Sequence, residues 1–161
     1  MPAGRVEAIF LAASARAEPS SVPAARAVPG RGLEGDRYFL GAGTFTNWQG
    51  RREGEALTLI EAEVLEAMRN EQEIDIGAGA SRRNVVTRGV ALNDLVGKRF
   101  RVGQVECYGD RPCDPCRHLE RLTEDGVLRA LADRGGLRAD ILHEGRIAVG
   151  DALCEISIAP R

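Results

Sequence analysis

Short apolar runs of period two, separated by glycine turns, constrain the fold of this chain more than any other feature. Alternate side chains of a strand point to the same face, so such runs predict short strands with one buried face. Val6–Phe10 is one example, and three further runs follow residue 136. Glycine supplies 19 of the 161 residues and aromatic residues only 4%, as expected for many tight turns. A closed barrel removes the exposed edges of short strands, so we expect a mainly β, closed β-barrel with two or three short helices.

A predicted hairpin and the last strands supply most of the expected core. Within the hairpin we place Phe100 and Val102 on one face, and Val105 and Cys107 on another. Cys154 lies in a similar alternating pattern, so it and Cys107 are expected to be buried and unreactive. The residues predicted to lie in the barrel core are Phe100, Cys107, Ile141, Val149 and Ile156.

Two helices and an edge strand are expected beside the hairpin. Val64 and Met68 fall on one helical face, which predicts an amphipathic helix. A later helix is capped at its start by Thr123 or Asp125 and stopped by a glycine pair. The proline-rich region before residue 30 reads as extended chain, with an edge strand around Ala24–Val28.

Composition limits the classes of function. The formal charge of −2 shows no basic excess, which argues against an electrostatic nucleic-acid binder. No apolar run approaches the length of a transmembrane helix, and the first residues do not resemble a secretory signal. We therefore expect a cytoplasmic protein without a membrane partner, whose four cysteines are thiols, metal ligands or catalysts rather than disulfides.

The stretch Arg111–His118, RPCDPCRH, is the most informative for function. A proline comes immediately before each of its two cysteines. Because proline lacks a backbone N–H donor and has a fixed φ, we expect a stiff loop outside any strand ladder that presents both thiols. We call Cys113–Cys116 the cysteine segment.

Three interpretations of the cysteine segment compete. A structural zinc site needs four ligands, and the chain has one Cys-x-x-Cys only. A thioredoxin-like pair normally opens a helix in a β-α-β unit, which we do not expect here. In the third interpretation Cys116 is a reactive thiolate that ligates a cofactor or carries sulfur. Arg117, His118 and a helix expected to follow favour that thiolate, whereas Asp114 opposes ionisation of Cys113.

A glycine-rich segment, Gly30–Arg37, carries Asp36 and Arg37. It lacks the spacing and the strand-to-helix context of a dinucleotide-binding loop. Its simplest interpretation is a structural turn with a local Asp36–Arg37 ion pair.

The segment Ser81–Thr87, SRRNVVT, combines guanidinium and amide side chains. On a strand, Arg82 and Asn84 point to one face and Arg83 to the other. A guanidinium beside an amide suits an oxyanion or a phosphate. We therefore expect Arg82 and Asn84 to line one cavity with Cys116, and Arg83 to point elsewhere or to pair with an acid. The alternative is a solvated strand end.

Taken in order, these segments resemble the MOSC domain, the C-terminal domain of molybdenum cofactor sulfurases. The similarity covers roughly residues 5–156, and the order and spacing of its motifs are specific. The matching segments are Gly35–Arg37, Leu57–Glu63, Arg82–Asn84, Pro112–Cys116, Gly135–Arg138 and Gly150–Asp151.

The resemblance implies a MOSC-like β-barrel in which Cys116 ligates molybdenum or carries sulfur. It also implies that Arg82 and Asn84, with Arg37 and Arg83, contact the anionic part of the pterin cofactor or of the substrate. The family includes enzymes that reduce N-hydroxylated bases and amidoximes, so a molybdenum-dependent reductase or a sulfur transferase is implied. The alternative is a non-catalytic module that delivers cofactor or sulfur.

The chain is expected to be a minimal, stand-alone member, with residues 1–161 forming one domain. We expect no PLP-dependent domain, and the scattered cysteines do not form a ferredoxin motif. A reductase of this kind needs electrons from a separate electron-transfer protein, and a sulfur carrier needs a cysteine desulfurase as partner.

Overall fold

The structure, a computed structural model, describes residues 4–14, 17–40, 55–74, 77, 79–114, 119, 123 and 126–156. The strands among these residues are β1 (Gly4–Leu11), β2 (Ser20–Val22), β3 (Ala24–Val28), β4 (Gly32–Leu33), β5 (Leu57–Glu61), β6 (Val85–Arg88), β7 (Arg99–Val102), β8 (Val105–Pro112), β9 (Leu137–Ile141), β10 (Gly145–Ala148) and β11 (Ala152–Glu155). The helices are α1 (Arg37–Leu40), α2 (Ala62–Gln72) and α4 (Val127–Ala130), with 3-10 turns η1 (Gly79–Ser81) and η2 (Leu92–Leu95).

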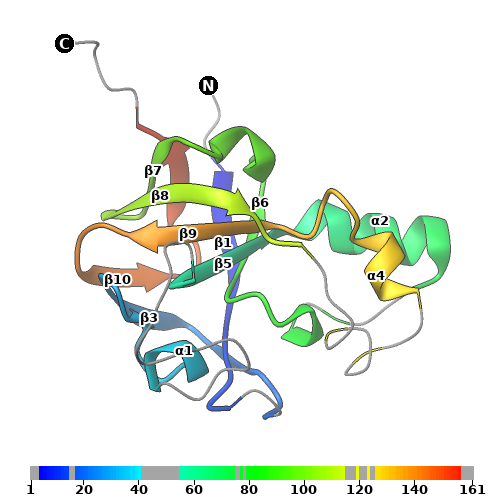
Figure 1. The fold of residues 1–161 in the computed structure, drawn as a ribbon, viewed down its shortest axis with the longest axis horizontal. Coiled ribbons are helices and arrows are strands. Elements are labelled where there is room, and N and C mark those ends of the chain that lie inside the picture. The colour runs from blue at the N-terminus through cyan, green and yellow to red at the C-terminus, as the bar shows by residue number, and fades with distance from the viewer. Residues whose placement is uncertain are drawn as a thin grey trace.

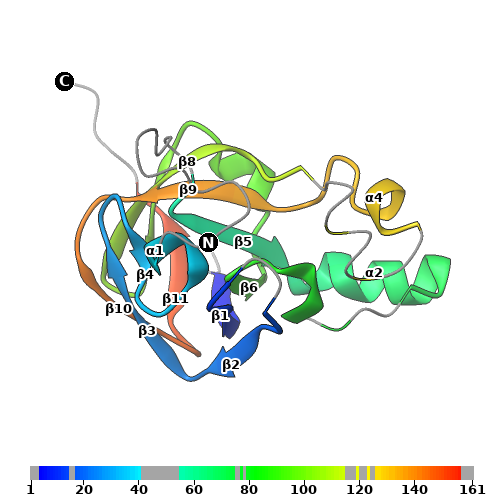
Figure 2. The same cartoon turned by 60° about the horizontal axis from the view of Figure 1, so that its bottom comes forward.

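Seven of the described strands close into a barrel (Figure 1). Their order is β11-β7-β8-β9-β5-β6-β1, and β1 pairs with β11 to complete the ring. Strand β2 pairs with β1 but is not one of the seven strands of the ring. Strands β10, β3 and β4 form a second, small sheet beside it (Figure 2). The prediction of a mainly β, closed barrel is confirmed. The predicted strand at Ala24–Val28 is present as β3, but it lies in the middle of the small sheet rather than at an edge.

One connection in the barrel is a β-α-β unit, which was not expected. Strand β5 pairs in parallel with β6, and helix α2 makes the crossover between them. Helices α2 and α4 lie together at one end of the barrel (Figures 1 and 2). Buried residues of both helices share a second apolar cluster with β6, and Val64 and Met68 are among them as predicted. The cysteine segment follows β8, outside this unit, so it does not have the position of a thioredoxin-like motif.

The barrel interior is filled by fully buried apolar side chains. Phe100 lies opposite Cys107 and Val102 opposite Val105 across the β7–β8 hairpin, and all four are completely buried. Directly opposed residues of antiparallel strands project to the same side of the sheet. The prediction of two separate faces was therefore wrong, because the four side chains form one inward face.

In β11 and the residue after it, the side chain that faces the core is that of Leu153, not those of the predicted set, Cys154 and Ile156. Leu153 is fully buried, whereas Cys154 is exposed and Ile156 is half-buried outside the core cluster. A shift of one residue moves a whole alternating set to the opposite face, so the predictions for Cys154 and Ile156 were wrong. Val149 is 46% exposed because β10 ends at Ala148 and the chain has turned before the alternation reaches it. The core predictions for Phe100, Cys107 and Ile141 are confirmed.

The start of helix α4 also differs from the prediction. Gly126, in a left-handed conformation, is the N-cap, and no side chain caps the helix there. The Thr123 hydroxyl instead donates to the Leu119 carbonyl at 2.7 Å, and Asp125 lies outside the described residues. Among the described helices, none has both the length and the apolar character needed to cross a membrane.

Candidate functional site

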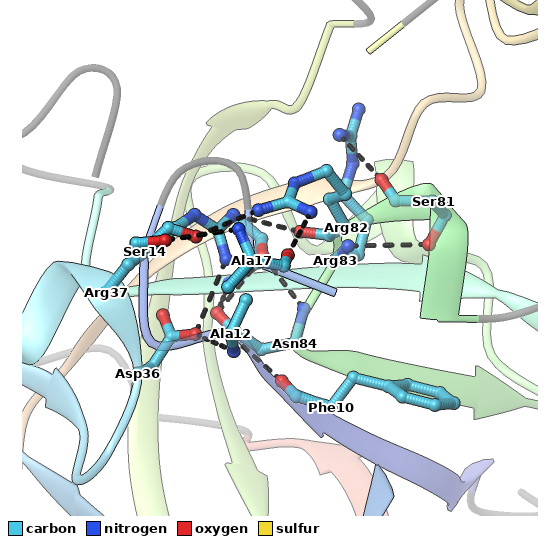
Figure 3. Close-up of polar contacts among 11 residues, drawn as sticks. Phe10, Ala12, Ser14, Ala17, Asp36, Arg37, Ser81, Arg82, Arg83 and Asn84 are labelled. Atoms are coloured by element: carbon cyan, nitrogen blue, oxygen red, sulfur yellow. Dashed lines mark hydrogen bonds and ion pairs between the residues drawn. The ribbon is translucent and has the colours of Figure 1, made fainter. Parts of the chain in front are cut away.

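Three chain segments that are far apart in the sequence meet at one end of the barrel (Figure 3). They are the end of β1 with the residues after it, the turn that leads into α1, and the segment between η1 and β6. Each segment contributes either a guanidinium group or the backbone that holds one. We call Asp36, Arg37, Arg82, Arg83 and Asn84 the arginine cluster.

Asp36 fixes the first arginine of the cluster. Its carboxylate is almost fully buried, accepts from the Ala12 backbone N–H at 3.0 Å and pairs with the Arg37 guanidinium at 3.4 Å. The Arg37 backbone N–H in turn donates to the Ala12 carbonyl at 2.7 Å. The predicted Asp36–Arg37 ion pair is therefore present, and the same turn ties Arg37 to the end of β1.

Arg82 is not part of a strand. The predicted alternation, which placed Arg82 and Asn84 on one face of a strand and Arg83 on the other, was therefore wrong. Strand β6 begins at Val85, and Arg82 has φ 62° in the left-handed region, which few residues with a side chain adopt. Its guanidinium turns back and donates to the carbonyls of Ala17 at 2.8 Å and Ser14 at 3.2 Å. Arg37 donates to the Arg82 carbonyl at 3.2 Å, so the structure brings these two arginines together.

The electrostatics of the arginine cluster are those of a cationic site. Burial and the neighbouring Arg37 lower the pKa of Arg82, and the Asp36 carboxylate opposes this shift. The Asp36 carboxylate pairs with Arg37 and attracts the Arg82 guanidinium. Guanidinium groups bind anions through charge-assisted hydrogen bonds, so this half-buried pair of arginines is a candidate anion site.

Arg83 is directed away from Arg82 into the protein. It is 7% exposed, and its guanidinium donates to three backbone carbonyls: Gly135 at 2.9 Å, Ser81 at 3.2 Å and Cys113 at 3.2 Å. Among the described residues no acid forms an ion pair with it. Arg83 therefore contacts the first residue of the cysteine segment directly.

Asn84 joins two barrel strands through its amide. Its Oδ1 accepts from the Thr58 backbone N–H at 3.3 Å and from the Thr58 hydroxyl at 3.1 Å, and its Nδ2 donates to the Phe10 carbonyl at 3.3 Å. It is 5% exposed. The position of Asn84 is thus defined by β1 and β5, and its side chain does not run beside that of Arg82.

The loop predicted over Arg111–His118 begins later than expected. Strand β8 continues through Pro112, which lies opposite Leu137 of β9, so this proline ends a strand ladder instead of standing outside one. Cys113 is 1% exposed, which corrects the expectation that the loop presents its thiol. Its backbone N–H donates to the Gly136 carbonyl at 2.8 Å. Cys116 lies outside the described residues, so a cavity shared by Cys116 and Arg82 stays a prediction.

The remaining described cysteines differ in environment. Burial raises the pKa of the Cys107 thiol to about 12, with smaller contributions from two nearby acids, so this thiol stays protonated inside the barrel. Cys154 is exposed on the outer face of β11. In the described part of the chain, no three His, Cys, Asp or Glu side chains converge as metal ligands.

Sequence reasoning missed the backbone that holds the cluster. Ser14 and Ala17 contribute carbonyls to Arg82, and backbone acceptors leave no trace in residue identity. Thr58 lies in an apolar run of the sequence, so it was not selected as a site residue. In the fold its hydroxyl donates to the Asn84 side chain and accepts from the Asn84 backbone N–H.

A closed barrel that carries a cationic cluster beside a cysteine-bearing segment defines the class of protein. Residues 34–154 match the family model of the MOSC domain, so the chain belongs to the MOSC domain family. The resemblance found from the sequence motifs is thereby confirmed.

Solved structures agree on the fold. The chain is similar to the YuaD protein from Bacillus subtilis, with a TM-score of 0.74, 16% identity and 94% of each chain covered. It is also similar to YiiM from Geobacillus stearothermophilus, with a TM-score of 0.70, 16% identity, and 96% of this chain and 75% of that chain covered. For YiiM from Escherichia coli the TM-score is 0.67 and the identity 19%, with 98% and 72% covered. A comparison with curated proteins found no match.

Proposed function

We propose that this MOSC domain protein associates with the molybdenum cofactor, and that Cys116 ligates molybdenum or carries sulfur. The observation that carries the proposal is the arrangement of Arg37, Arg82 and Arg83. Two of these guanidinium groups form a half-buried cationic site, and the third is bonded to Cys113, three residues before Cys116. The consecutive residues Arg82 and Arg83 therefore link the proposed anion site to the cysteine segment.

The residues present fit an anionic pterin. Arg82 and Arg37 would hold its anionic part, since guanidinium groups bind phosphate-type oxygens through charge-assisted hydrogen bonds. Asp36 orients Arg37 through their ion pair and keeps it from turning outward. The Asn84 side chain hydrogen-bonds to the backbones of β1 and β5 and so anchors the segment that carries Arg82 and Arg83. When bound, the cofactor supplies two-electron redox chemistry that no side chain of the protein offers.

The reductase form of the proposal is the reduction of N-hydroxylated substrates. Cleavage of an N–O bond takes up two electrons and two protons and releases water. The electrons would come from a separate electron-transfer protein. In the sulfur-carrier form, a cysteine desulfurase would load sulfur onto the Cys116 thiolate, and the arginine cluster would bind the acceptor.

The proposal is tested by metal analysis of protein produced in a host that makes the molybdenum cofactor. The wild type, Cys116→Ser and Cys113→Ser are compared, the last as a matched control in the same segment. We expect stoichiometric molybdenum in the wild type and in Cys113→Ser, and its loss from Cys116→Ser while the fold is retained. A wild type without molybdenum whose Cys116 releases sulfur to a reductant supports the carrier form. Zinc in place of molybdenum, or full molybdenum in Cys116→Ser, contradicts the proposal.

A further inference from the structure

Arg83 is the almost fully buried arginine of the cluster, and the described hydrogen bonds of its guanidinium all go to backbone carbonyls. Arginine is seldom buried without a carboxylate partner, because desolvating the charge costs free energy. Here the charge is compensated by three carbonyl dipoles from Ser81, Cys113 and Gly135. Ser81 ends η1, Cys113 follows β8 and Gly135 precedes β9, so the acceptors come from three separate parts of the chain. A residue kept in so costly a setting holds those segments in a fixed relation.

We infer that Arg83 is a positioning residue, which fixes the start of the cysteine segment next to the anion-binding Arg82. The inference rests on the proposed function for what the cysteine segment does. The positioning itself concerns only contacts of the described residues and is tested without cofactor.

Hydrogen bonds hold both backbone polar groups of Cys113, the first residue of the cysteine segment. The Cys113 carbonyl accepts from Arg83, and the Cys113 N–H donates to Gly136. Gly136 is itself fixed, because a Cβ atom there would lie 2.0 Å from the Leu59 carbonyl oxygen and the residue has φ 114°. The contact with β5 thus anchors the glycine pair, and the glycine pair with Arg83 anchors Cys113.

The same guanidinium also shapes the turn that carries Arg82. Its Nη1 donates to the Ser81 carbonyl, immediately before the residue with the left-handed backbone. Because Arg82 and Arg83 are consecutive, the clamp on Cys113 and the turn that directs Arg82 toward Ser14 and Ala17 form one rigid unit. The placement of Arg82 relative to Cys113 is therefore set by Arg83 and not by the loop alone.

Lysine cannot replace this arrangement. A guanidinium has five N–H donors in a planar fork, and three of its nitrogens donate here in three directions. An ammonium group donates from a single point. Arg83→Lys should therefore keep the positive charge and lose most of the clamp.

The thiol of Cys113 reports on the clamp, and that of Cys107 reports on global opening, since both are almost completely buried. The test compares the rates at which N-ethylmaleimide modifies these thiols in the native wild type, Arg83→Met and Arg83→Lys, read by peptide mass spectrometry. Arg134→Met is the matched control, because Arg134 also donates through Nε to a backbone carbonyl, at 2.8 Å, and its described partners are Ala130, Gln72 and Glu71.

In Arg83→Met we expect Cys113 to react about tenfold faster or more, since charged hydrogen bonds that opposed local opening are gone. Cys107 should stay as slow as in the wild type, and Arg83→Lys should keep most of the increase. Arg134→Met should leave both rates unchanged. A Cys113 rate no higher than in the control overturns the inference, and so does a parallel rise of both thiols, because it indicates global destabilisation. If Arg83→Met does not fold, Arg83→Lys decides by the same comparison.

The molybdenum content of the same proteins separates the two proposals. A wild type that holds no molybdenum and no labile sulfur on Cys116, together with selective exposure of Cys113 in Arg83→Met, contradicts the proposed function and supports the positioning role. A wild type with molybdenum and an unchanged Cys113 rate contradicts the positioning role alone.

Discussion

Replacement of Arg82 by asparagine should separate anion binding from stability. Asparagine accepts the left-handed backbone that Arg82 occupies at φ 62°, so the turn is kept while the charge is removed. The loss of hydrogen bonds to Ser14 and Ala17 is offset because the charge of Arg82 is no longer buried beside Arg37, and burial and Arg37 are the two causes that lower the Arg82 pKa. The free energy of unfolding should therefore stay within about 1 kcal/mol of the wild type. A charged hydrogen bond contributes about 1.5–3 kcal/mol, so anion affinity should fall about 10- to 150-fold.

The assay is isothermal titration with inorganic phosphate, alongside urea unfolding of the same proteins. Arg146→Asn is the control, because it removes an equal charge from an exposed position on β10. We expect the control to bind phosphate as the wild type does. Equal affinities for the wild type and Arg82→Asn, or equal losses in Arg82→Asn and the control, would refute the assignment of Arg82 to an anion site.

Three further predictions follow from particular contacts. Gly136→Ala should destabilise the protein by about 3 kcal/mol or more in urea unfolding, since the new Cβ would meet backbone oxygen at 2.0 Å, whereas Gly30→Ala, with open space around it, should cost about 1 kcal/mol. Burial raises the pKa of Glu61 above its ordinary value of 4.5, so the folded protein favours the protonated carboxyl group. The resulting contribution to the free energy of unfolding is complete below pH 4.5 and is lost as the pH rises through the raised pKa. The stability of Glu61→Gln relative to the wild type should therefore increase from about pH 4 to about pH 7, and a constant difference would contradict the assignment. In the native protein a thiol reagent should label Cys154 readily and Cys107 only on unfolding, because Cys154 is exposed and the pKa of Cys107 is raised to about 12.

The barrel could be predicted from the sequence because its strands obey a simple alternation. Phe100, Cys107 and Ile141 lie in the core as that alternation requires. The alternation fails where its phase is ambiguous: Leu153 and Cys154 are both apolar enough to face inward, and pairing with β7 decides between them. It also fails where a strand ends early, as at Val149.

The sequence motifs selected residues that the structure brings together in the arginine cluster, but not the geometry of that cluster, and their role in a site stays a prediction. The order of the motifs pointed to Arg37, Arg82 and Asn84. The assumption that these residues lie on a strand gave the wrong side-chain directions. Arg82 adopts a left-handed backbone, which the sequence pattern does not predict for an arginine. The role of Arg83 depends on carbonyls of Cys113 and Gly135, and such long-range backbone contacts exist only once the barrel has closed.

The most direct test of the account is the amount of molybdenum and pterin that copurifies with the protein from a host that makes the cofactor, measured for the wild type and Arg82→Gln. The account predicts stoichiometric molybdenum with pterin in the wild type. It predicts a loss of at least about tenfold in Arg82→Gln, which matches removal of one charged hydrogen bond. A wild type that holds neither molybdenum nor pterin and no labile sulfur on Cys116, or an Arg82→Gln protein that holds as much molybdenum and pterin as the wild type, would contradict it.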